Sequence, residues 1–131
     1  MANYKTTEYI VNAVAALITS INKPKYLFTK PTKKNDAEYI VINAFGGQAD
    51  VMQKFFVNVN YHVRDIKDNA GPSGIPDVEK LQAGSEAVLA ILKSVTNANY
   101  LVDFEKPEII REEALGEHYS NLRFSYIQIN R

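Results

Sequence analysis

The most regular pattern in the chain is an alternation of apolar and polar residues over residues 54–65. Its apolar members are Phe55, Val57, Val59, Tyr61 and Val63. Side chains of an extended strand point alternately to its two faces, so this period of two predicts a strand with one buried and one polar face. The exception is Phe56, which lies among the polar positions. Residues 38–45 are almost continuously apolar, which predicts a central strand covered on both faces.

Two other segments carry apolar residues at helical spacing. Residues 6–21 repeat them at steps of three and four, and Thr6 or Thr7 can cap this helix. Residues 77–95 predict a second helix, with Asp77 near the positive end of its dipole. Gly84 and Ser85 interrupt its apolar stripe, and we interpret this as a place where the helix crosses a strand closely.

The remaining segments complete a predicted order of α-β-β-β-α-β-β. Residues 25–30, 100–104 and 119–130 predict strands, whereas residues 107–115 fit either a strand or a helical turn. Strands in adjacent runs favour an antiparallel or mixed sheet, with the two helices packed on one of its faces. Residues 1–131 are therefore expected to form a single α+β domain.

Residues 67–76 contain two Gly and two Pro, which predicts a loop. Glycine loses the most backbone entropy on ordering, and the segment has few apolar residues to offset that loss. We expect Asp68–Ile75 to be mobile in the isolated subunit and ordered only in an assembly.

Composition narrows the function classes. The chain is 46% hydrophobic and 23% charged, as expected for a soluble globular domain. The absence of Cys excludes disulfides, thiolate metal sites and cysteine nucleophiles. Fifteen basic residues balance fifteen acidic ones, which argues against specific nucleic-acid binding and against electrostatic membrane binding. The sequence also shows no signal peptide and no apolar run long enough for a membrane helix.

The two histidines are the main candidates for chemistry. His62 lies on the polar face of a predicted strand, and we interpret it as a hydrogen-bonding surface residue rather than a ligand or base. His118 falls in a predicted turn beside acidic residues, where a metal site with Glu117 and Glu113 is the alternative to chance proximity.

The C-terminal third is rich in acidic residues. We interpret these carboxylates as a solvated strand edge that discourages aggregation, rather than as a pair for acid/base catalysis. The residues are Glu105, Glu108, Glu112, Glu113 and Glu117. No phosphate-binding glycine motif is present, so we expect no enzyme activity and no cofactor.

The order and spacing of the elements resemble those of phage tail-terminator and tail-completion proteins. The matching segments are Thr6–Ile21, Tyr26–Pro31, Tyr39–Phe45, Phe55–Asp65, Asp77–Val95 and Tyr100–Arg131. The resemblance implies a structural virion protein that forms a homo-oligomeric ring, commonly a hexamer. Such a ring stops tail-tube polymerisation and offers a docking surface to the head, so it implies a tail-tube protein and a head-completion or connector protein as partners. It also implies a place in the virion tail or neck, and in the host cytoplasm during assembly.

Two other function classes stay open. One is a small α+β ligand-binding or enzymatic domain that uses His62 or His118. The other is a nucleic-acid module, for which residues 25–30 supply the one stretch that mixes aromatic and basic side chains.

Charge is unevenly distributed along the chain. Residues 1–35 carry six Lys and one acidic residue, whereas residues 101–131 carry four basic and six acidic residues. This pattern fits either two solvated faces or copies that meet head to tail. The interface candidates come from the basic segment, the Gly/Pro segment and the acidic segment. They are Lys33, Lys34, Asp68, Gly71, Ser73, Gly74, Glu112 and Glu113.

Overall fold

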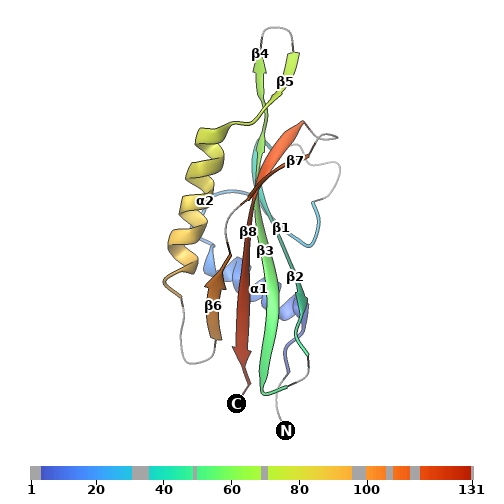
Figure 1. Cartoon of the computed structure of the whole chain (residues 1–131), viewed down its shortest axis with the longest axis vertical. Coiled ribbons are helices and arrows are strands. Elements are labelled where there is room, and N and C mark those ends of the chain that lie inside the picture. Colours follow the sequence, from blue (N-terminus) through green and yellow to red (C-terminus); the bar gives the residue numbers. More distant parts are fainter. Residues whose placement is uncertain are drawn as a thin grey trace.

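The computed structural model describes residues 4–30, 36–48, 50–68, 71–95, 100–105, 108–112 and 116–130. Its centre is a mixed sheet built on three long antiparallel strands, β2 (Glu38–Gly46), β3 (Met52–Arg64) and β8 (Glu117–Ile129). The short strand β1 (Lys25–Leu27) pairs in parallel with β2 at one edge. At the other edge β6 (Tyr100–Phe104) and β7 (Glu108–Glu112) both pair antiparallel with β8 (Figure 1). The ambiguous segment 107–115 is thus a strand where it is described.

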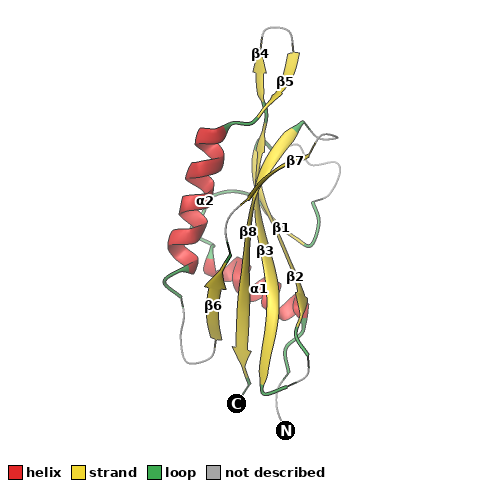
Figure 2. Ribbon diagram, viewed as in Figure 1, coloured by secondary structure: helices red, strands yellow, loops and turns green. Residues whose placement is uncertain are grey.

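Two helices cover the same face of this sheet (Figure 2). The first, α1 (Thr7–Leu17), begins at Thr6, whose side chain accepts a hydrogen bond from the backbone N–H of Tyr9. The second, α2 (Val78–Leu92), is capped by Asp77, which satisfies a backbone donor that the helix itself leaves unpaired. The α+β class, the placement of the helices and the predicted order of elements are confirmed.

The core lies between the helices and the sheet, and it matches the predicted alternation. The odd-numbered apolar residues of β3 from Phe55 to Val63 are all buried against α1 and α2. Gly46 ends β2 and Gly47 follows it, with backbone φ angles of 93° and 83°, a region that favours glycine.

The predicted close crossing of α2 is confirmed at Gly84. A Cβ atom at this position would lie 2.3 Å from the ring of Tyr61 on β3. Beside it, the hydroxyl of Ser85 donates a hydrogen bond to the backbone carbonyl of Leu81 and lies 2.6 Å from the hydroxyl of Ser120 on β8. The interruption in the apolar stripe is therefore a place where the helix packs directly against the sheet.

The prediction of a loop over residues 67–76 is wrong. Two short antiparallel strands, β4 (Ile66–Asp68) and β5 (Gly71–Ile75), form a hairpin inserted between β3 and α2. Proline and glycine are tolerated here because each strand of a two-stranded sheet has a neighbouring strand on one side only. The backbone groups on its other side make no hydrogen bonds within the sheet, so a missing N–H there costs nothing. The hairpin extends beyond the end of the main sheet (Figure 1). Mobility of Asp68–Ile75 stays a prediction, and residues 69–70 lie outside the described residues.

Among the described residues, no helix has the length and apolar character needed to cross a membrane.

Candidate functional site

A cluster of aromatic and ionisable side chains lies on the helix-free face of the sheet. Tyr39, His62 and Tyr119 occupy paired positions on β2, β3 and β8. The His62 ring stacks between the two tyrosines, with centroid distances of 4.5 Å to Tyr39 and 4.6 Å to Tyr119. The ammonium group of Lys30 lies 4.5 Å from the centroid of the Tyr39 ring. The three rings form a stacked row across the sheet.

Glu117 is the acceptor at the centre of this cluster. Its Oε1 accepts hydrogen bonds from the hydroxyl of Tyr39 and from Nδ1 of His62, the latter at 2.9 Å. The residue is only 4% exposed. Burial by itself would raise the pKa of Glu117, but the hydrogen bonds from His62 and Tyr39 and the charge of Lys30 outweigh it and lower the pKa below its ordinary value. Glu117 is therefore held as a carboxylate that fixes the orientation of His62.

A second histidine–carboxylate pair lies behind the first. His118 follows Glu117 along β8, so its side chain points to the opposite face, beneath the helices. Its Nδ1 lies 2.6 Å from Oδ1 of Asp65, and both residues are buried. Asp65 also ties the two chain segments together through its backbone N–H, which donates to the carbonyl of Gly116.

The structure contradicts three interpretations made from the sequence. His62 makes the predicted hydrogen bond but is buried rather than on the surface. His118 lies in strand β8 rather than in a turn, and Glu117 is buried rather than part of a solvated edge. No local sequence signal predicts these pairs, because the partners are 55 and 53 residues apart along the chain.

The predicted metal alternative is not supported by the geometry. Glu117 and His118 lie on opposite faces of the sheet, and Glu113 falls outside the described residues. In the part of the chain that the structure describes, no three His, Asp or Glu side chains are grouped to hold a metal ion.

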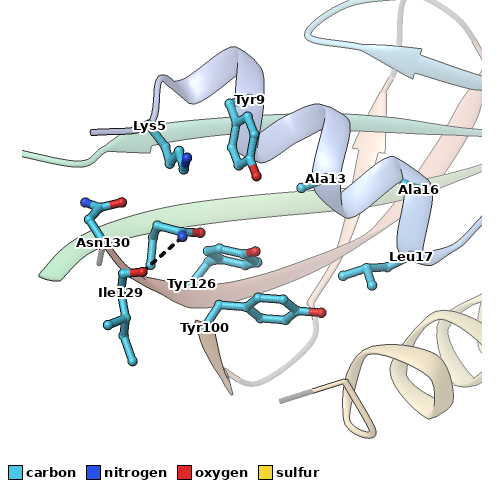
Figure 3. A pocket seen from close by; sticks show the side chains of 10 residues that line it. Lys5, Tyr9, Ala13, Ala16, Leu17, Tyr100, Tyr126, Ile129 and Asn130 are labelled. Atoms are coloured by element: carbon cyan, nitrogen blue, oxygen red, sulfur yellow. Dashed lines mark hydrogen bonds between the residues drawn. The ribbon is translucent and has the colours of Figure 1, made fainter. Parts of the chain in front are cut away.

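A carboxylate that orients a histidine is the arrangement a general base requires, but a base also needs space for a substrate. A cavity of about 510 Å³ lies between α1 and the end of β8, and neither histidine lines it (Figure 3). The histidine pairs and this cavity are separate features.

The interface candidates gather at one end of the molecule wherever they are described. Asp68 ends β4, and Gly71, Ser73 and Gly74 belong to β5. Glu112 ends β7 at the same end, because it pairs with Glu117, which in turn pairs with Arg64 just before the hairpin. Lys33, Lys34 and Glu113 lie outside the described residues.

An apolar surface at the base of the hairpin was not predicted from the sequence. Ile66 and Ile75 face each other across the two strands and are 45% and 51% exposed. Val78, in the first turn of α2, is 56% exposed. Isoleucines that flank a Gly/Pro segment on both sides are the signal that would have suggested a cross-strand pair.

No protein-family model matches this chain, and no curated protein matches it in sequence closely enough to count as a relative.

Proposed function

We propose that this chain is a structural virion assembly protein that resembles a phage tail terminator. In this proposal it forms a homo-oligomeric ring that ends tail-tube polymerisation and joins the tail to the head. Its partners are a tail-tube protein and a head-completion or connector protein, and it resides in the tail or neck of the virion.

The observation that carries the proposal is the β4–β5 hairpin. Among the described residues, the two strands pair with each other and with no third strand. A two-stranded hairpin is only marginally stable by itself in water, so an arm of this kind gains stability when another chain covers it. The exposed pair Ile66 and Ile75 supplies apolar area for such a contact.

A contact is heterologous when one end of a molecule binds a different surface of its neighbour. Copies joined in this way form a closed ring when the rotation between neighbours divides a full turn evenly. The hairpin is suited to this because it extends past the sheet at one end only (Figure 1).

The test is the assembly state and its effect on tail tubes. We expect light scattering on a sizing column and negative-stain microscopy to find rings, and we expect the rings to bind one end of tail tubes from the same virus. The double variant Ile66→Lys/Ile75→Lys should remain a folded monomer. The matched control Val51→Lys/Met52→Lys changes two residues that are each 56% exposed, beside the start of β3 at the far end of the sheet, and should still form rings.

A wild-type chain that stays monomeric at high concentration and ignores tail tubes would rule out this function. Rings formed equally well by the Ile66→Lys/Ile75→Lys variant would show that the hairpin is not the contact.

One observation favours a second function, a small ligand-binding or enzymatic domain. Glu117 holds His62 in a fixed orientation, as an enzyme would orient a base. Replacing His62 and His118 with Gln should then abolish an activity while the fold persists. Unchanged assembly and tube binding by the same double variant would support the structural role instead.

A further inference from the structure

The cavity of about 510 Å³ between α1 and the end of β8 is lined mainly by aromatic and small apolar side chains. Ala13 and Ala16 leave room on the α1 side. The sheet side carries Tyr100 and Tyr126, whose rings stack with centroids 4.9 Å apart (Figure 3). A volume of this size is in the range of small-molecule sites. The cavity can therefore hold a small ligand with an apolar body.

One hydroxyl group opens into this cavity without a partner. Tyr126 is 2% exposed, and its hydroxyl makes no hydrogen bond with any described residue. Within the described part of the chain, the side-chain atoms that are both sealed from solvent and unpaired are Arg123 Nε and Asn130 Oδ1. The Tyr126 oxygen is not one of them, so it reaches open space, and that space is the cavity that Tyr126 lines.

Two more tyrosines lie close to this hydroxyl. Figure 3 shows the Tyr9 ring projecting from α1, with its hydroxyl directed toward the sheet on the side of Tyr126. Burial first, and then the neighbouring Tyr100 and Tyr9, raise the pKa of Tyr126 above its ordinary value of 10.0. The Tyr126 hydroxyl therefore stays protonated at neutral pH and is available as a hydrogen-bond donor.

Lys5 gives the cavity its charge. Among the described residues that line it, Lys5 alone is charged, since the carboxamides of Gln128 and Asn130 are neutral. Its ammonium group lies 4.8 Å from the centroid of the Tyr9 ring and makes no ion pair with a described carboxylate. Tyr9 thus lies next to both Lys5 and Tyr126. An unpaired cation beside an unpaired hydroxyl donor is complementary to an anion.

We propose that this cavity binds a small carboxylate with an aromatic body. The carboxylate accepts a hydrogen bond from the Tyr126 hydroxyl, and Lys5 supplies the opposite charge. A single cation matches a single negative charge, which favours a carboxylate over a phosphate dianion. Aromatic walls favour an aromatic body, because ring pairs gain energy beyond the area that they bury. All of these groups belong to one chain, so this proposal does not rest on the proposed function.

Three probes test the chemistry. Benzoate has the ring and the charge, benzamide has the same shape without the charge, and acetate has the charge without the ring. We expect benzoate to shift the NMR amide signals of cavity residues saturably, with a dissociation constant on the order of 1 mM. Benzamide and acetate should each bind roughly tenfold more weakly. Benzamide or acetate binding as well as benzoate, or no saturable shift with benzoate, would overturn the proposal.

Two substitutions test the location. Lys5→Met removes the cation at nearly the same side-chain length, and Tyr126→Phe removes the hydroxyl but keeps the ring that stacks on Tyr100. We expect each variant to weaken benzoate binding at least about fivefold. Lys5→Met should leave the weak binding of benzamide unchanged, because that ligand carries no charge.

The matched controls make the same two changes at exposed residues outside the cavity lining. They are Lys80→Met, in the first turn of α2, and Tyr4→Phe. Both should bind benzoate like the wild type. Wild-type benzoate affinity in Lys5→Met or in Tyr126→Phe, with the NMR spectrum of a folded chain, would contradict the proposal. An equal loss in the controls would also contradict it, because the effect would then not come from the cavity.

Discussion

The two faces of the main sheet are formed by the same three long strands, yet different interactions stabilise them. Beneath the helices the strands contribute apolar side chains such as Ile42, Val57 and Phe124, none of which has measurable exposed area. On the helix-free face the neighbouring positions carry amides. Nδ2 of Asn58 donates to Oδ1 of Asn43 at 2.9 Å, and Nδ2 of Asn121 donates to Oδ1 of Asn58 at 3.1 Å.

The helix-free face also covers its own aromatic rings. The guanidinium group of Arg123 lies 5.0 Å from the ring centroid of Phe45 and 5.2 Å from that of Phe56, and these two rings stack on each other. Apolar burial is not directional, whereas amide ladders and ring stacks depend on geometry. A sheet face without helices can thus remain ordered when its side chains satisfy one another.

The sharpest way to test this difference is to truncate one phenylalanine on each face. Phe124→Ala should lower the free energy of unfolding by about 3–5 kcal/mol, because it leaves a cavity under the helices. Phe45→Ala removes a ring that is 47% exposed and should cost less than about 1 kcal/mol. Urea denaturation at a concentration where the chain is monomeric measures both. Similar losses for the two variants would mean that the faces are not energetically distinct.

The covered face should also be sensitive to added volume. Gly84→Ala would place a Cβ atom 2.3 Å from the Tyr61 ring, so we expect a loss of about 1–3 kcal/mol, against the usual gain from alanine in a helix. Thermal or urea unfolding measures it. The control is the same change in a Tyr61→Ala background, where the penalty should disappear. A persistent penalty there would place the strain elsewhere.

On the helix-free face the largest single effect should come from Glu117. Glu117→Gln removes the charge that accepts from His62 and Tyr39, and we expect a loss of about 1–2 kcal/mol at neutral pH. Since folding lowers the pKa of Glu117 below its ordinary value of 4.5, its stabilisation is present above that pH and is lost as the pH falls through the lower, folded-state pKa.

Urea titrations between pH 7 and pH 3 check this dependence. The difference between wild type and Glu117→Gln should narrow below about pH 4.5. Glu105→Gln, at a carboxylate whose side chain is 53% exposed, should not reproduce that narrowing. A gap that stays constant with pH would show that the charge of Glu117 is not what stabilises the fold.

The smallest expected effect is in the row of hydrogen-bonded asparagines on the helix-free face, Asn43, Asn58, Asn60 and Asn121. Asn121→Ala removes two hydrogen bonds, at 3.1 Å to Asn58 and 2.7 Å to Asn60, in a half-buried position. We expect a loss of about 1 kcal/mol. The control Gln82→Ala removes an exposed amide from α2 and should change stability by less than about 0.5 kcal/mol. Indistinguishable melting curves for the two variants would mean that the hydrogen bonds of Asn121 do not stabilise the fold.

Local patterns were sufficient for most of the fold. The alternation from Phe55 to Val63, with Phe56 as its exception, placed the buried face of β3. Thr6 and Asp77 marked the starts of both helices, because periodicity and capping act within a few residues of one another. The interruption at Gly84 also indicated a place where α2 packs closely against the sheet. The hairpin was missed because Gly and Pro argue against strands in general, although a two-stranded arm tolerates both.

Sequence by itself determined the class of this protein, its element order and its covered face, since each depends on neighbours along the chain. Only the tertiary structure decided the sites. His62 pairs with Glu117 and His118 pairs with Asp65, and each pair joins residues more than 50 positions apart along the chain. Burial and hydrogen bonding between such residues arise from strand register, which no local pattern contains.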